Sequence, residues 1–331
     1  MTNRIAVLVV GGAGYIGAHC AKALSEAGHI PVCFDNLSSG HRDFVKWGPL
    51  IEGDLLDTSL ITQTIQNYQV AVVLHLAGYS DVGDSMTNPL ECYAANVNGT
   101  LALLAAMRKA RCARIIFSSS GAVYGNAGPG LISEQHQCSP VNPYGASKWM
   151  IERILLDFRS AYQLSPVCFR YFNAAGADPG NHIGELRYQE THLIPRAIMA
   201  AQGHLTDFSV YGHDFETEDG TAVRDYIHVS DLAAAHVKAV SRLISGHPGG
   251  TYNLGTGKGS SVSEILKAIT HETGKSVPYT TKSRRAGDPP CLIADPALSK
   301  SELGFTTKHS DLSFIIKTAW AWHREHPPAC Q

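Results

Sequence analysis

The segment Ile5-Ala6-Val7-Leu8-Val9-Val10 runs directly into Gly11-Gly12-Ala13-Gly14-Tyr15-Ile16-Gly17 near the start of this 331-residue chain. An apolar run followed by glycines three residues apart is typical of a buried strand, a tight turn and the start of a helix. The free N–H groups and positive dipole end of such a helix suit a pyrophosphate. The segment therefore predicts a dinucleotide site, although glycine turns also occur where a strand simply passes into a helix.

An acidic residue strengthens this prediction. Asp35 lies eighteen residues after Gly17, directly beyond a second apolar segment, Ile30 to Phe34. A carboxylate at that place accepts hydrogen bonds from both hydroxyls of an adenosine ribose and repels a 2′-phosphate. We therefore expect NAD in preference to NADP, whereas Asp35 taken alone is equally compatible with a solvated turn beside Asn36.

Composition excludes several classes of protein. Hydrophobic residues make up 44% of the chain and charged residues 17%, which is ordinary for a globular protein and unlike a disordered one. The formal net charge is −2 and there is no basic block, so neither nucleic acid nor an anionic membrane is an expected partner. The apolar run Ile5 to Val10 is too short for a signal peptide or a membrane span, so we expect a cytoplasmic protein.

Cysteine and histidine spacing argues against a metal site. The eight cysteines are scattered without a C-x-x-C pair, which favours reduced thiols over disulfides or zinc. None of the sixteen histidines forms H-x-x-x-H or H-E-x-x-H, so we predict no metal. The acidic stretch Asp214 to Asp219 is interpreted as a solvated loop.

Strands and helices alternate through the first half of the chain, and this alternation predicts a Rossmann-type, doubly wound parallel sheet. After about Ala174 the composition shifts towards Gly, Pro, His and acidic residues. We therefore expect a NAD-binding domain over residues 1–174 and a smaller α/β substrate lobe over 175–331, with some segments returning to the first domain. The expected strands are Ile5–Val10, Ile30–Phe34, Val70–Leu76, Ile115–Ser118 and Val167–Tyr171, and the expected helices are Gly14–Ala27, Leu60–Tyr68, Pro89–Lys109 and Tyr144–Tyr162.

One glycine-rich segment resembles a phosphate-binding loop but does not match its spacing. Gly255-Thr256-Gly257-Lys258-Gly259 lacks the G-x-x-x-x-G-K-[ST] spacing of a phosphate loop. The following Ser261-Val262-Ser263-Glu264 has the pattern of a capping box, which starts a helix. We interpret both segments as structural.

A tyrosine and a lysine carry the candidate proton chemistry. Tyr144 and Lys148 are four residues apart and therefore lie on one face of a helix. A tyrosine has a reference pKa of about 10, and a nearby ammonium and an oxidised nicotinamide would both favour its phenolate. The spacing alone is a common coincidence of amphipathic helices. Ser120 ends the run Ser118-Ser119-Ser120 after an apolar strand, where open α/β sheets bind ligands and where a hydroxyl would relay a proton.

These residues, together with further segments, resemble the UDP-glucose 4-epimerases of the extended short-chain dehydrogenase/reductase family. The glycine turn and the Tyr/Lys pair define only the superfamily, whereas the segments that begin at Arg224 and Arg284 are more specific. The resemblance extends from Ile5 to about Trp322. Its other segments are Asn96–Thr100, Arg170–Asn173, Glu216–Thr221, Arg224–Val229, Tyr252–Gly255 and Arg284-Arg285-x-Gly287-Asp288.

The resemblance implies roles for individual residues, with Ser120, Tyr144 and Lys148 as the catalytic group. It assigns Gly11, Gly14, Tyr15, Ile16, Gly17, Asp35, Asn36, Asp54, Leu55, Asn96 and Lys148 to NAD. It assigns Ser120, Tyr144, Asn173, His192, Tyr211, Arg224, Arg285, Asp288 and Leu292 to a UDP-sugar. It also implies a homodimer formed by the helices Pro89–Lys109 and Tyr144–Tyr162.

Three positions depart from the pattern of the family. Ser80 replaces a lysine that touches the cofactor, so one phosphate or ribose contact is in doubt. Ala122 replaces a threonine near the catalytic serine, and His192 replaces an asparagine that contacts the UDP phosphates. None of these changes removes a proton-transfer group.

The implied activity is reversible C4 epimerisation of a UDP-hexose with bound NAD. A nucleotide-sugar 4,6-dehydratase is one alternative, but it needs an acid and a base beside the serine, where this chain has Gly121-Ala122. A non-catalytic NAD-sensing regulator is another, but such a protein has no need of both Tyr144 and Lys148.

Overall fold

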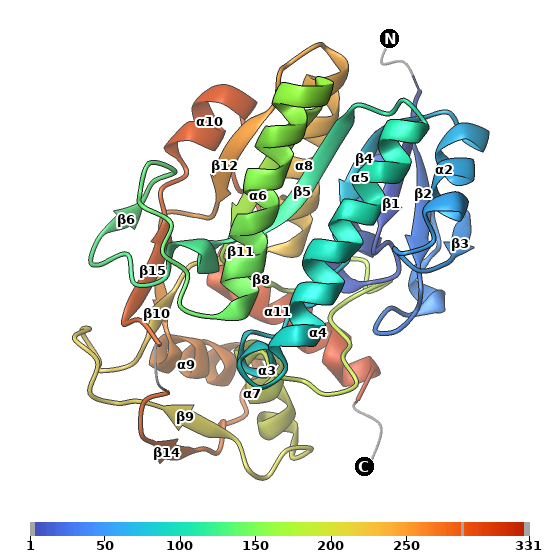
Figure 1. Ribbon diagram of the computed structural model, residues 1–331. Helices are drawn as coiled ribbons and strands as arrows, with labels where there is room; N and C mark the ends of the chain where they lie inside the picture. The colour runs from blue at the N-terminus through green and yellow to red at the C-terminus, as the bar shows by residue number, and fades with distance from the viewer. Residues whose placement is uncertain (1–3, 286–287, 328–331) are drawn as a thin grey trace.

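The computed structural model describes residues 4–285 and 288–327, and a seven-stranded parallel sheet lies at its centre (Figure 1). Its strand order, β12-β7-β5-β4-β1-β2-β3, reverses direction between β1 and β4. This is the doubly wound parallel sheet that the sequence predicts. The strands are β1 (Ala6–Val10), β2 (Ile30–Asp35), β3 (Leu50–Glu52), β4 (Val70–His75), β5 (Arg114–Ser120), β7 (Ser165–Tyr171) and β12 (Gly250–Leu254).

Helices cover both faces of the sheet. Helices α1 (Tyr15–Glu26) and α8 (Val229–Ile244) lie on one face, and α2 (Thr58–Asn67), α5 (Gly99–Lys109) and α6 (Pro143–Tyr162) lie on the other. Alternate residues of β1 enter the two cores, since Val7 and Val9 pack with α1 and α8, whereas Leu8 and Val10 pack with α2, α5 and α6. Burial on both sides explains why the central strands β1 and β4 are almost continuously apolar.

The predicted single helix Pro89–Lys109 is wrong in its middle. The structure has α4 (Pro89–Tyr93), a π turn over Ala94–Asn98 and then α5, and α3 (Val82–Thr87) precedes them. Asn96 lies in the π turn, where its side chain bonds to Ser147 and to the backbone of Tyr79. Apolar periodicity carries no information about such a polar tie, because the same residues fit an uninterrupted helix.

The smaller lobe lies below the sheet in Figure 1 and has its own core, which α7 (Leu193–Gln202), α9 (Val262–Thr273) and α11 (Leu312–Glu325) share. The predicted capping box at the start of α9 is present, with Ser261 and Glu264 bonded reciprocally. Its strands form three small sheets. Helix α10 (Ala297–Leu303) follows β15 along the chain. The sheets contain β13 (Ser260–Ser261), β10 (Val223–Arg224), β15 (Cys291–Ala294) and β6 (Leu131–Ile132); β11 (Tyr226–His228) and β8 (Asn173–Ala175); and β14 (Thr280–Lys282) and β9 (Ser209–Tyr211).

The chain crosses between the two parts more than once. Strand β6 comes from the first half of the sequence but pairs with β15 of the smaller lobe. Strand β12 comes from the second half but completes the central sheet beside β7. A boundary at residue 174 therefore stays a prediction, with returning segments on both sides of it.

Within residues 4–285 and 288–327, the structure has no helix that is both long and apolar enough to cross a membrane.

Candidate active site

The glycine turn between β1 and α1 forms an open cradle. Gly11 has φ +83°, and a Cβ there would lie 2.6 Å from the backbone nitrogen of Ala77. A Cβ on Gly17 would lie 2.0 Å from the carbonyl oxygen of Gly11, so neither position accepts a larger residue. Gly14 caps α1 without any side-chain hydrogen bond, which leaves its first N–H groups for a ligand. These features fit a dinucleotide pyrophosphate.

Asp35 lies beside this cradle at the end of β2. Its side chain is 8% exposed and accepts hydrogen bonds from the backbone nitrogens of Ala13 at 2.9 Å and Leu37 at 2.8 Å. A carboxylate oxygen accepts more than one hydrogen bond, so Asp35 retains capacity for ribose hydroxyls. Asn36 donates to Asp54 at 2.9 Å, which ties the ends of β2 and β3 together in the predicted adenosine region.

Asn96 is held by hydrogen bonds within the protein, through which it supports the loop after β4. It is 2% exposed, accepts from the backbone nitrogen of Tyr79 at 2.7 Å and donates to Ser147 Oγ at 2.8 Å. A Cβ on Gly78 would lie 2.5 Å from its Oδ1. Other predicted NAD residues take structural contacts as well, since Tyr15 donates to the carbonyl of Gly176 at 2.6 Å. Ile16 is partly buried against the core of α1 and α8, and Leu55 packs against the start of α5.

The structure brings Ser120, Tyr144 and Lys148 together at the carboxyl end of β5. Asn142 caps α6 by accepting from the backbone nitrogen of Gly145 at 2.8 Å, which places Tyr144 in the first turn and Lys148 one turn later. Lys148 Nζ donates to the carbonyl of Ser118 at 2.9 Å and lies 5.7 Å from the centre of the Tyr144 ring. Ser120 Oγ accepts from the backbone nitrogen of Ala122 at 3.1 Å.

In the protein alone, burial disfavours the charged forms of both Tyr144 and Lys148, which is the opposite of what a phenolate base would need. It raises the pKa of Tyr144 above 10, and the Ser120 hydroxyl and the Arg187 guanidinium oppose that rise. Burial also lowers the pKa of Lys148 to about 8. The expected lowering of the Tyr144 pKa by Lys148 is therefore not a property of the protein alone. A bound positive charge, such as an oxidised nicotinamide, would act in the direction that the phenolate needs.

The residues predicted to hold the sugar nucleotide form two groups in the smaller lobe. Arg224 bonds Asp288 at 2.6 Å and lies opposite Leu292 in the pairing of β10 with β15. Leu292 and Phe172 both pack against the buried cluster of Val123, Tyr124 and Ile132, and a Cβ on Gly121 would lie 3.1 Å from the Phe172 ring.

The second group is a stacked pair. The guanidinium of Arg285 lies 4.0 Å from the centre of the Tyr211 ring. A cation over an aromatic face is attracted to it, so Arg285 and Tyr211 hold each other in place. Asn173, on β8, pairs with Tyr226 of β11. Gly287 of the same motif lies outside the described residues, as does Cys330.

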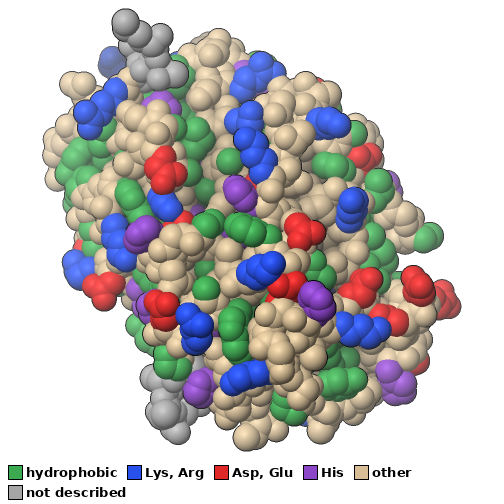
Figure 2. Space-filling model, turned by 180° about the vertical axis from the view of Figure 1, so that it is seen from behind, with side chains coloured by type: hydrophobic (Ala, Val, Ile, Leu, Met, Phe, Trp, Pro, Cys, Tyr) green, Lys and Arg blue, Asp and Glu red, His purple; other side chains and the backbone are tan. Residues whose placement is uncertain are grey.

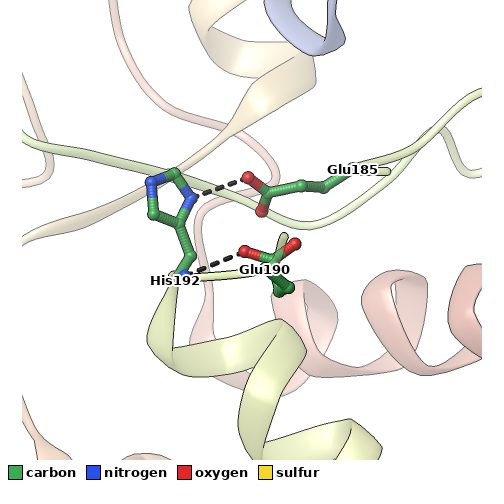
Figure 3. Close-up of side chains that lie close together, drawn as sticks. All are labelled: Glu185, Glu190 and His192. Carbon is green, nitrogen blue, oxygen red and sulfur yellow. Dashed lines mark hydrogen bonds and ion pairs between the residues drawn. The ribbon is translucent and has the colours of Figure 1, made fainter. Parts of the chain in front are cut away.

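His192 is held by two glutamates at the start of α7 (Figure 3). Its Nδ1 lies 2.6 Å from Glu185 Oε1, and its backbone nitrogen donates to Glu190 at 2.8 Å. The Glu185 carboxylate raises the pKa of His192 above its usual 6.5. Burial and Glu185 raise the pKa of Glu190 to about 7. The three side chains are close enough to share an ion, but their hydrogen bonds already orient His192, and the absence of a metal stays a prediction.

Sequence reasoning missed Arg187. It bonds Glu185 at 3.0 Å, and its charge opposes the rise that burial causes in the pKa of Tyr144 and of Tyr15. No strand or helix contains it and no motif names it, so only the folded chain reveals it.

Comparisons with known proteins agree with this geometry. The model of the NAD dependent epimerase/dehydratase family matches residues 7–255. A UDP-glucose 4-epimerase of Rhizobium leguminosarum bv. trifolii is 46% identical over 96% of this chain and 97% of its own length.

Two solved structures are similar across nearly the whole fold. The UDP-glucose 4-epimerase of Brucella ovis in complex with NAD is 50% identical, with a TM-score of 0.94 over 96% of this chain and 98% of its own. The enzyme of Bifidobacterium longum in complex with NAD+ and UDP is 35% identical, with a TM-score of 0.91 over 98% and 99%. The chain therefore belongs to the NAD dependent epimerase/dehydratase family, within its branch of UDP-glucose 4-epimerases.

Proposed function

We propose that this protein interconverts UDP-galactose and UDP-glucose by epimerisation at C4, with NAD as a cofactor that is not consumed. The observation that carries the proposal is the cluster of Ser120, Tyr144 and Lys148 beside the glycine cradle and Asp35. Full-length similarity to UDP-glucose 4-epimerases supports the same conclusion.

The residues divide the chemistry among them. Tyr144, as phenolate, takes the proton of the sugar 4-hydroxyl, directly or through Ser120. NAD, when bound, would accept and return the hydrogen of C4 with its electron pair. Lys148, held by the carbonyl of Ser118, keeps a positive charge near the phenol and would also reach the nicotinamide ribose.

Reversal of the C4 configuration requires the 4-keto sugar to present its other face. We assign Arg224 and Arg285 to the diphosphate, which stays in place while the sugar turns about its link to it. Asn173, Tyr211, His192, Asp288 and Leu292 complete the proposed binding site for the sugar nucleotide. Tyr144 then returns the proton, and no net oxidation occurs.

A turnover assay with a matched variant tests the proposal. The protein is incubated with UDP-galactose, and the products are separated by chromatography. We expect UDP-glucose from the wild type and none from Tyr144→Phe, which should retain NAD because only a hydroxyl is lost. Tyr144→Phe with more than a few per cent of the wild-type kcat would remove Tyr144 as the base. A 4-keto-6-deoxy product would favour the dehydratase, and bound NAD without turnover of any UDP-sugar would favour the regulator.

We also propose a homodimer formed by α4, α5 and α6. Large apolar side chains are exposed along these helices, namely Leu90, Leu101, Trp149, Met150, Leu156 and Tyr162. The opposite face, shown in Figure 2, carries charged side chains and histidines interspersed with hydrophobic ones. An apolar face of this kind suits a second copy. Light scattering should give twice the chain mass, and Trp149→Glu with Leu156→Glu should give a monomer.

A cytoplasmic location fits the state of the thiols. The seven cysteines in the described residues are all free, and five of them are buried. Reduced thiols are typical of proteins in a reducing compartment.

A further inference from the structure

Arg187 lies beside the loop that follows β4. Its Nη1 is 3.5 Å from Ser80 Oγ, just beyond β4, and its charge acts on Tyr15 at the start of α1 and on Tyr144 at the start of α6. Strands β1 and β4 flank the point at which the strand order reverses. Ligands of doubly wound sheets bind in the crevice at that point.

The guanidinium retains donors for a ligand. Its Nε donates to Glu185 at 3.0 Å, and among the described residues its Nη2 makes no hydrogen bond. Glu185 is shared, because His192 Nδ1 also lies 2.6 Å from the same oxygen. One carboxylate therefore faces both a guanidinium and an imidazole, and the Arg187 side chain remains 29% exposed.

We propose that Arg187 binds the phosphates of the NAD cofactor and supplies the cationic contact for which position 80 has only a serine. The inference rests on the proposed function, since it takes NAD as the cofactor. The contact of Arg187 with Ser80, in the loop after β4, favours NAD over the UDP-sugar as the source of these phosphates, whereas its hydrogen-bond link to the proposed sugar site, within the described residues, runs only through Glu185, which His192 shares. Tyr15 follows Gly14 of the glycine cradle, and Ser80 lies three residues after Ala77, which meets Gly11, whereas Arg224 and Arg285 lie with Asp288 and Tyr211 in the smaller lobe.

Proximity to Ser80 gives the proposal a specific rescue. A lysine at position 80 would place its ammonium near the space that the guanidinium now occupies. If Arg187 acts by its charge on the cofactor, Ser80→Lys should compensate for Arg187→Gln. If Arg187 only holds the segment before α7 in place, a lysine on another loop should not compensate.

The test compares the wild type, Arg187→Gln, Ser80→Lys/Arg187→Gln and the control Arg324→Gln, whose side chain is 66% exposed on α11. NAD is extracted from each purified protein and quantified, and NAD and UDP are each titrated by calorimetry into stripped protein. We expect Arg187→Gln to lose bound NAD, to weaken NAD affinity about ten- to a hundredfold and to leave UDP affinity unchanged. The double variant should recover most of the NAD affinity, and the control should match the wild type.

Three results would overturn the inference. These are unchanged NAD affinity in Arg187→Gln, a loss of UDP affinity in place of NAD affinity, and no recovery in the double variant. Melting temperatures of the stripped proteins check folding, and His192 keeps Glu185 partnered in the variants. No sugar turnover enters these measurements. A protein that bound NAD through Arg187 but epimerised nothing would therefore contradict the proposed function and not this inference.

Discussion

At the scale of single residues, the buried charge of Lys148 lowers the stability of the fold, and its proposed role is in the chemistry of the site. Lys148 is 5% exposed, and burial lowers its pKa to about 8 from an ordinary value of 10.5. Below the folded pKa, the lysine carries its proton in both the folded and the unfolded state. The charge is less stable when it is buried, so over that whole pH range it disfavours the folded state. The cost is therefore fully present at pH 7 and disappears as the pH rises from 8 to 10.5.

Replacement of this lysine should therefore stabilise the protein. We expect Lys148→Met to raise the free energy of unfolding of the NAD-free protein at pH 7 by on the order of 2 kcal/mol, less at pH 10, and to abolish epimerisation. Urea unfolding at both pH values measures the effect. A variant that is less stable than the wild type at pH 7 would show that the bond to the carbonyl of Ser118 outweighs the cost of burying the charge.

Leu292 sets a second prediction, on substrate size. It packs on β15 against the cluster of Val123, Tyr124 and Ile132, and its proposed place is at the border of the sugar site. We expect UDP-glucose and UDP-galactose to be preferred over N-acetylated sugars, with Leu292→Ser raising and Leu292→Tyr lowering kcat/KM for the latter. A wall of one or two methylenes is worth about 1–3 kcal/mol, so the changes should be about ten- to a hundredfold. Equal kcat/KM for both sugar types in the wild type would refute the preference, and indifference to both substitutions would mean that Leu292 only packs the lobe.

The sequence was informative about residues that act within one local pattern. Gly11, Gly17 and Asp35 stand at fixed distances along one βα unit, and Tyr144 and Lys148 share one helix face, so spacing alone predicted their proximity. Arg187 is different. It reaches Ser80, more than a hundred residues earlier, from a segment without periodicity, and only the tertiary fold creates that contact.

At the scale of elements, the π turn at Ala94–Asn98 is the feature that periodicity could not predict. Wide turns of this kind are frequent at functional sites, and here the turn holds Asn96 between the loop after β4 and α6. The capping box of α9 was predictable because its two side chains act on their own helix, whereas Asn96 acts on two other elements.

Removal of the Asn96 amide should loosen this junction. Asn96→Ala leaves the backbone nitrogen of Tyr79 without its acceptor, and we expect a loss of about 1–3 kcal/mol in the free energy of unfolding together with weaker NAD binding. Asn98→Ala, at an exposed position of the same π turn, is the matched control and should change neither. Urea unfolding and NAD titration measure both quantities. Equal behaviour of the two variants would mean that Asn96 does not hold the loop.

At the scale of the whole molecule, alternating patterns predicted five strands of the central sheet, β1, β2, β4, β5 and β7, because they are largely buried on both faces, whereas the edge strands β3 and β12 were not predicted. The crossings of β6 and β12 between the two parts could not be predicted in the same way. Strand β6, for example, has only two residues and so shows no pattern of its own. The folded chain also buries ionisable groups. Five histidines within the described residues are at most 5% exposed: His19, His75, His228, His236 and His323.

These buried histidines predict a sharp acid limit to stability. Burial lowers the pKa of His75 to about 3 and of the other four to about 4, whereas the unfolded chain takes up their protons near pH 6.5. Below pH 6.5 the unfolded state therefore binds more protons, and each histidine lowers the free energy of unfolding by about 1.4 kcal/mol per pH unit. We expect urea unfolding between pH 7 and 5 to show this steep decline. His236→Phe, which replaces a ring stacked edge-on against Phe169, should flatten the slope by one proton, and His204→Gln, at an exposed position, should not. A stability that is constant from pH 7 to 5 would mean that these histidines gain compensating partners as they become charged.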